Sequence, residues 1–216
     1  MRFTSLATLL VLLAAPAFAT TVDLTTPNSH GFIGSAEFST NDRQSAGTGV
    51  IEPFLRVQAN PTEHGFNSDG PLNGDLSQVK GGTWTHSVAV EDLAIQNFGS
   101  GDVIQLFLDV NQAGSSPLIS LDELRLYTAS SPNITSLAQL GFENLVYDMG
   151  FGNRVLLNHN LESGSGSGDM TALVPASGLA GHDAEYFYLY CKFGTSGAPY
   201  TANSGFEEWA GLLKKK

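Results

Sequence analysis

The amino-acid sequence predicts an all-β protein, a single antiparallel β-sandwich that is jelly-roll-like and contains at most one or two short helices. Charged residues make up only 14% of the 216-residue chain, whereas long amphipathic helices need more charge on their solvent-facing side. Glycine is abundant, at 24 residues, and short apolar runs alternate with clusters of Gly, Asn, Ser and Asp. This pattern is typical of short strands joined by tight turns.

The N-terminal segment has the features of a secretory signal peptide. Arg2 gives a basic start, a short apolar run follows, and Ala17-Phe18-Ala19 fits a cleavage site before Thr20. The apolar run is too short to span a bilayer, and no second apolar segment of spanning length follows. We therefore expect the protein to be secreted or held at the cell surface. The predicted organisation is a signal peptide at 1–19, a β-sandwich domain at 20–210 and a basic tail at 211–216.

The chain is acidic, with a formal net charge of −11 at pH 7. Such a surface disfavours nucleic acid and anionic membranes and favours divalent cations. Cys191 is the single cysteine, so an intramolecular disulfide is excluded and stability must come from the core, with bound ions as a second source. Because Cys191 lies in an apolar run, we expect it to be buried rather than nucleophilic.

Strand-like segments follow one another between turn clusters. In residues 50–59, Ile51, Leu55 and Val57 share one face, and Pro53 restricts that strand to an edge or a bulge because it cannot donate to a ladder. The expected strands are 31–39, 50–59, 83–90, 102–110, 120–127, 143–149, 153–161, 170–174, 185–193 and 205–210. The pair 143–149 and 153–161 is expected to form a hairpin that turns at Gly150-Phe151-Gly152.

Three further segments are expected to lie outside strands. Residues 60–82 are polar and glycine-rich, which favours a long loop. Residues 131–140 are the best helix candidate, with Ser131 as the cap. The Gly-Ser run 162–169 is expected to be a tight loop, because strand-like sequence resumes directly after Asp169.

The strongest strand signal lies in residues 185–193. Strict alternation places Phe187, Leu189, Cys191 and Phe193 on one face, which should belong to the core. The opposite face carries a stripe of tyrosines, namely Tyr186, Tyr188 and Tyr190. This stripe is either a second packing face, which we favour, or an exposed aromatic platform.

Residues 106–127 are interpreted as a hairpin with its turn at Gly114-Ser115-Ser116-Pro117. Symmetric pairing then places Asp109 opposite Asp122, with Asn111 further along the same face. Opposed like charges destabilise paired strands, so this arrangement needs a shared proton, a cation, or a strand register different from the symmetric one. The alternative is that these acids are simply solvated in turns.

A calcium ion suits the oxygen ligands that this hairpin offers. The sequence predicts Asp109, Asn111 and Asp122 as its central ligands, with Asp169 or Glu207 completing the shell. Alternation places Glu123 on the other face of its strand, where it can pair with Arg125 instead.

Motifs of the common enzyme classes are absent from the sequence. It has no Gly-x-Ser-x-Gly elbow, no His-Glu-x-x-His zinc motif, no P-loop and no dinucleotide fingerprint. Its five histidines are scattered, and paired carboxylates carry little weight among 21 acidic residues. We therefore expect a protein that is not an enzyme.

Six runs carry a resemblance to a known group of proteins. They are LFLDVNQ (106–112), SPLISLDEL (116–124), LVYDMG (145–150), SGSGSGDM (163–170), YLYCKFG (188–194) and SGFEEWA (204–210). In order and spacing they resemble uncharacterised bacterial secreted proteins of the PEP-CTERM-associated type. The resemblance implies export and a place at the cell surface or in extracellular matrix, and it brings no established activity. The chain departs from the pattern at its end, where a PEP-CTERM tail is missing.

Two functions are consistent with these observations. The first is a secreted non-catalytic protein, a structural or adhesion component of the cell surface or of a biofilm-type matrix, with calcium as a stabilising ion. The second is a carbohydrate-binding module that stacks sugar on an aromatic platform. The platform residues of the second reading are Trp84, Tyr186, Tyr188, Tyr190 and Trp209. The expected partners are extracellular polysaccharide or other matrix and surface proteins.

Overall fold

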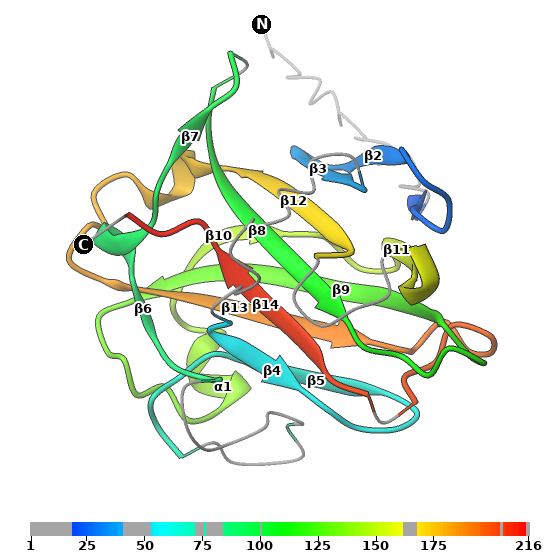
Figure 1. Ribbon diagram of the computed structural model, residues 1–216. Coiled ribbons are helices and arrows are strands. Elements are labelled where there is room, and N and C mark those ends of the chain that lie inside the picture. The colour runs from blue at the N-terminus through cyan, green and yellow to red at the C-terminus, as the bar shows by residue number, and fades with distance from the viewer. Residues whose placement is uncertain are drawn as a thin grey trace, which may run out of the picture.

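Two β-sheets packed face to face form the protein in the computed structural model (Figure 1). The structure describes residues 19–40, 53–71, 76, 84–99, 101–161, 168–203 and 205–214. The all-β sandwich predicted from the sequence is confirmed. Three predicted segments lie wholly or largely outside the described residues: the signal peptide, the Gly-Ser loop and the end of the basic tail.

Sheet A has the strand order β1-β11-β9-β13-β5, with β10 also paired to β9 and β6 to β13. Its strands are β1 (Thr21–Asp23), β5 (Glu63–Phe66), β6 (Val88–Ala89), β9 (Leu118–Ala129), β10 (Asn144–Asp148), β11 (Arg154–Asn158) and β13 (Tyr186–Phe193). Its pairs are antiparallel except that β1 runs parallel to β11, which corrects the expectation of a purely antiparallel sandwich.

Sheet B has the order β2-β3-β12-β8-β14-β4, with β7 paired to β8. Its strands are β2 (His30–Ile33), β3 (Ala36–Ser39), β4 (Leu55–Val57), β7 (Gln96–Asn97), β8 (Asp102–Val110), β12 (Met170–Pro175) and β14 (Glu207–Gly211). The described helices are all short: η1 (Val90–Asp92), α1 (Leu137–Leu140), η2 (His159–Leu161) and η3 (Ala176–Leu179). The prediction of at most one or two short helices is confirmed for α-helix, since α1 is the one α-helix among the described residues and η1, η2 and η3 are short 3-10 helices.

The prediction from local sequence was wrong about the position of two elements. Helix α1 begins after Ser136, whose hydroxyl accepts a hydrogen bond from the Gln139 amide, and not at Ser131. Strand β5 lies within the segment expected to be a loop, because pairing with β13 stabilises a polar stretch that has weak strand propensity of its own.

The predicted hairpin at 106–127 is wrong, because its two strands belong to different sheets. Strand β8 pairs with β12 and β14 in sheet B, whereas β9 pairs with β11 and β13 in sheet A. Leu108 of β8 and Leu124 of β9 reach the same core from opposite sides. The turn residues 114–117 therefore connect the two layers and not two neighbours in one sheet.

The second predicted hairpin is also wrong. Strands β10 and β11 are both antiparallel to β9 and follow one another along its same edge. Gly150 and Gly152 have φ values of +83° and +80°, which glycine adopts without strain. The Gly150–Gly152 segment is therefore a loop that leaves the sheet edge between two strands running in one direction.

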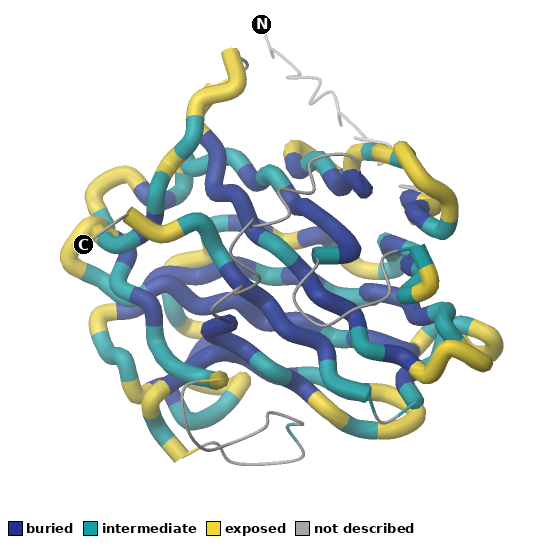
Figure 2. Tube along the Cα trace, viewed as in Figure 1, coloured by how far each residue is buried: buried dark blue, intermediate teal, exposed yellow. Residues whose placement is uncertain are grey.

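The core lies between the sheets, and Figure 2 shows buried positions concentrated along their strands. The predicted core face of β13 is confirmed, since Phe187, Leu189, Cys191 and Phe193 are all fully buried. The tyrosine stripe packs against a second cluster with Phe66, Ile134 and Leu140. Buried Tyr188 donates to the Ser131 carbonyl at 2.6 Å, which confirms that the stripe is a packing face.

Candidate functional site

A pocket of about 260 Å³, here named the charged pocket, opens on the outer face of sheet A. It combines side chains of β9, β10, β11 and β13 with two loops. Its lining residues are Asp122, Glu123, Arg125, Asp148, Gly150, Phe151, Gly152, Asn153, Arg154, Lys192, Thr195 and Ser196. Three acidic and three basic side chains contribute, so the pocket holds three of the ten basic residues of an acidic chain.

A β-bulge in β9 places two carboxylates in this pocket. Leu121 pairs with Phe193 and Glu123 pairs with Lys192, so Asp122 is an extra residue without a counterpart in β13. Asp122 and Glu123 therefore both point outward, while Leu121 and Leu124 on either side of them are buried. The predicted alternation of Asp122 and Glu123 between faces is wrong because of this bulge.

Ion pairs hold one side of the charged pocket. The Arg125 guanidinium lies 2.6 Å from Glu123 and 3.6 Å from Asp148, and Lys192 Nζ lies 3.4 Å from the other Glu123 oxygen. The predicted pairing of Glu123 with Arg125 is confirmed. Since each pair is partly exposed, its contribution to stability is small, and its main effect is to fix the side chains in place.

A hydrogen-bonded chain holds the other side. Asp122 accepts from the Thr195 amide at 2.7 Å and from the hydroxyls of Ser196 and Ser120 at 2.7 and 2.8 Å. Ser196 Oγ in turn accepts from Arg154 Nη1 at 3.1 Å. The acceptor Asp122 and the donor Arg154 are thus placed next to each other, joined by one hydroxyl.

Phe151 stands at the edge of the pocket and is 106% exposed. The positive φ angles of Gly150 and Gly152 turn the loop away from the sheet and present the ring to solvent. An aromatic ring beside ordered polar groups offers an apolar surface for stacking together with donors and acceptors for orientation.

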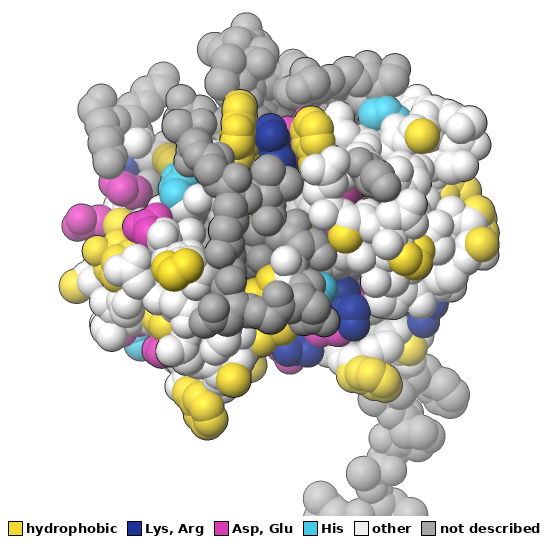
Figure 3. Space-filling model, turned by 90° about the horizontal axis from the view of Figure 1, so that it is seen from below, with side chains coloured by type: hydrophobic (Ala, Val, Ile, Leu, Met, Phe, Trp, Pro, Cys, Tyr) yellow, Lys and Arg dark blue, Asp and Glu magenta, His cyan; other side chains and the backbone are white. Residues whose placement is uncertain are grey.

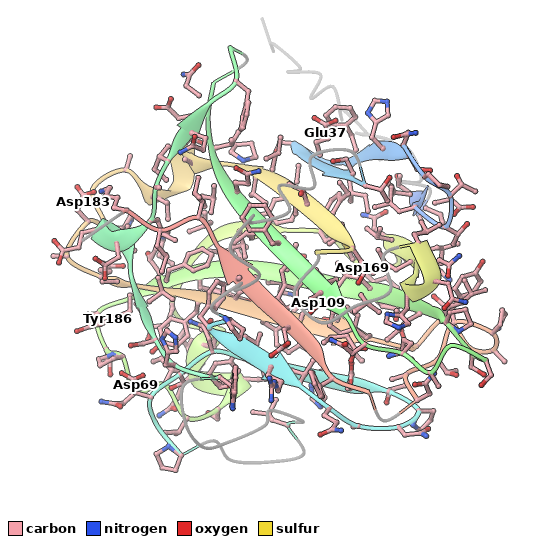
Figure 4. The ribbon with its side chains drawn as sticks, viewed as in Figure 1. Glu37, Asp69, Asp109, Asp169, Asp183 and Tyr186 are labelled. Carbon is pink, nitrogen blue, oxygen red and sulfur yellow. The ribbon has the colours of Figure 1, made fainter. Side chains whose placement is uncertain are left out.

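The calcium ligands predicted from the sequence do not come together. Leu108 and Val110 point into the core, so Asp109 between them lies on the outer face of sheet B, whereas Asp122 lies on the outer face of sheet A. Asp109 does lie beside Asp169, as Figure 4 shows, and Asp169 accepts from the Val110 amide at 2.7 Å. The predicted pairing of Asp109 with Asp122 around one ion is therefore wrong.

The remaining members of that predicted set do not complete a ligand shell either. Glu207 points inward from β14 and is fully buried, facing Glu63 of β5, and Asn111 follows the end of β8. Within the described ranges, no group of three or more Asp, Glu, His or Cys side chains is arranged to hold a metal ion. Calcium binding by the protein stays an untested prediction.

On sheet B, Asp109 faces a different acid from the one predicted, and an arginine pairs with that acid. Glu208 lies directly opposite Asp109, and Arg56 Nε donates to Glu208 at 2.8 Å. The Arg56 guanidinium lies 4.1 Å from the ring centre of Trp84 and 4.3 Å from that of Phe206. On the face seen in Figure 3, Lys and Arg side chains likewise lie next to Asp and Glu side chains.

The aromatic platform proposed from the sequence is not formed. Trp209 and Tyr188 are completely buried, and Tyr190 is 4% exposed. Tyr186 lies at the far end of β13, and the exposed Trp84 stacks on Arg56 in the other sheet. Sequence reasoning missed the aromatic residue Phe151. Its position between two glycines could have identified it, because a phenylalanine in a glycine turn is not explained by burial in the core.

Comparisons with known proteins give no relative for this chain. No protein-family model, no curated protein and no solved structure matches it. The resemblance to PEP-CTERM-associated secreted proteins therefore stays a prediction. Among the described residues, no helix is both long and apolar enough to cross a membrane.

Proposed function

We propose that the protein is a secreted, non-catalytic component of the cell surface or extracellular matrix that binds carbohydrate in the charged pocket. The observation that carries this proposal is the exposed Phe151 ring beside ordered donors and acceptors. Export is expected from the N-terminal sequence and places the pocket where extracellular polysaccharide is available.

The chemistry of a sugar ring matches these groups. Neighbouring hydroxyls on a ring need an acceptor and a donor close together, which Asp122 and Arg154 supply across Ser196. The C–H faces of the ring are apolar and can pack on an aromatic side chain such as Phe151. Opposite charges are balanced in the pocket, which favours a ligand that is polar and carries little charge.

Binding is favoured over catalysis by the way the carboxylates are held. A glycoside hydrolase of the common type needs one carboxyl group that donates a proton and a second that acts as nucleophile or base. Asp122 accepts hydrogen bonds from three groups, and Glu123 is paired with two cations. Both are thereby placed to orient a ligand as acceptors.

Phe151→Ala is expected to weaken glycan binding by about tenfold, because one aromatic stacking contact contributes about 0.5–1.5 kcal/mol beyond the area it buries. A glycan array with the chain that starts at Thr20 would identify the ligand, and calorimetric titration would then compare the variants. Phe142→Ala is the matched control, since Phe142 is 89% exposed and does not line the pocket. An array without hits, or equal losses in the two variants, would contradict the proposed function.

A further inference from the structure

Two glutamates from opposite sheets meet inside the sandwich. Glu63 belongs to β5 of sheet A and Glu207 to β14 of sheet B, and both are 0% exposed. Glu63 Oε2 accepts from the Ala59 amide at 2.8 Å, and Glu207 Oε1 accepts from the side-chain amide of Gln112. The two carboxyl groups lie next to each other, close enough for each to affect the protonation of the other.

The two carboxyl oxygens without a hydrogen-bond donor, one on each glutamate, need a cation or a proton to balance their charge. Within the described residues, no N–H or O–H of another residue reaches Glu63 Oε1 or Glu207 Oε2. Two buried carboxylates facing each other without compensation would repel strongly. Either a cation or a hydrogen ion must therefore lie between them.

The surroundings favour a proton over a metal ion. Calcium takes about six to eight oxygen ligands. Gln112 adds one neutral side-chain oxygen beside Glu207, and the described residues contain no group of three His, Cys, Asp or Glu side chains that could hold a metal ion. One proton needs only the two carboxyl oxygens that already face each other.

We propose that Glu63 and Glu207 share one proton, and that this carboxyl–carboxylate pair is a pH-sensitive latch between the two sheets. Because it links β5 to β14, it connects sheet A and sheet B through a polar bond inside an otherwise apolar interface. The latch does not depend on the proposed carbohydrate binding, and either can fail without the other.

The electrostatics support a bound proton. Burial raises the pKa of Glu207 well above its usual value, and the neighbouring Glu63 raises it further. Burial also raises the pKa of Glu63, although its hydrogen bonds to Glu207 and to the Ala59 amide oppose the rise.

Among the described residues, the groups that face the pair from the surrounding elements add no positive charge. On β13 the titratable neighbour is Cys191, and burial raises the pKa of its thiol well above the usual value, so it stays neutral. Gln112 and Asn111 contact Glu207 from the segment after β8, and both are uncharged.

The direction of the pH effect follows from linkage. In the unfolded chain a glutamate releases its proton near pH about 4.3, whereas the folded protein keeps the shared proton to a higher pH. Between these limits the folded state binds more protons, so stability falls as the pH rises. The latch contributes fully below the unfolded pKa and is lost as the pH passes through the raised folded pKa.

Thermal melts from pH about 4 to about 9 test the latch in the wild type, Glu207→Gln and Glu63→Gln. The melting temperature of the wild type should fall as the pH rises relative to that of Glu207→Gln. At pH about 8, Glu207→Gln should melt higher by about 3 °C or more, because its amide donates to Glu63 without titrating. Glu91→Gln, at an exposed position of η1, is the control and should follow the wild type.

A second measurement separates a proton from a metal ion. The infrared band of a protonated carboxyl group should persist in the wild type at pH about 7 and disappear in Glu207→Gln. Equal pH slopes in the wild type and both glutamine variants would overturn the latch. So would a wild-type melting temperature that falls on addition of chelator while that of Glu207→Gln stays constant, because the pair would then hold a cation.

Discussion

Gly194→Ala is expected to destabilise the protein by about 3 kcal/mol or more, because two separate costs coincide at this glycine. Its φ of +83° is strained for any residue with a Cβ atom. An added Cβ would also lie 2.4 Å from the Pro61 carbonyl oxygen and 2.8 Å from the Ala202 amide nitrogen. Both neighbours are backbone atoms joined by a hydrogen bond of 2.9 Å, so neither can move aside cheaply.

Gly197→Ala separates these two costs. Gly197 has a similar φ of +77°, but an added Cβ at this glycine would meet nothing within 4 Å. Only the left-handed backbone cost of about 1–2 kcal/mol should remain. Urea unfolding of both variants measures the difference, and equal losses would show that the close approach to residues 61 and 202 is not a constraint.

Gly194 also connects the fold to the charged pocket. Its amide donates to the Ser120 carbonyl at 2.9 Å, and the next two residues, Thr195 and Ser196, hold Asp122. A shift of this turn would displace both donors at once. Gly194→Ala should therefore weaken the binding of any ligand beside Asp122, whereas Gly197→Ala should affect that binding less.

Alternation in the sequence predicted the faces of strands better than their partners. It assigned Phe187, Leu189, Cys191 and Phe193 to the core correctly, because a face depends only on the two-residue period of a strand. Pairing depends on the rest of the chain. A turn-like segment between two apolar runs can close a hairpin or can connect two sheets, and residues 114–117 do the latter.

Irregularities explain why the candidate site was only partly predicted. The bulge at Asp122 has no signature in the spacing of apolar residues, so Glu123 was assigned to the wrong face. Glu207 was recognised as significant, but its partner Glu63 lies in a segment without strand-like alternation. Their contact depends on how the two sheets are stacked, which one sequence does not reveal.

Arg56→Met is expected to destabilise the protein by about 3 kcal/mol, because it removes the cation that neutralises a buried glutamate. The side chains of Arg56 and Glu208 are only 15% and 10% exposed. Two guanidinium nitrogens bond to the same Glu208 oxygen, and Glu208 lies opposite another acid, Asp109. Loss of the stacking on Trp84 and Phe206 should add about 0.5–2 kcal/mol.

The double variant Arg56→Met/Glu208→Gln tests whether charge is the cause. Methionine keeps much of the apolar stem of arginine, and glutamine removes the carboxylate that would otherwise be left buried. The double variant should therefore recover more than half of the stability lost in Arg56→Met, as measured by urea unfolding. If it is instead as unstable as the single variant, packing of Arg56 between the two aromatic rings dominates. In that case the ion pair with Glu208 contributes little to the free energy of unfolding.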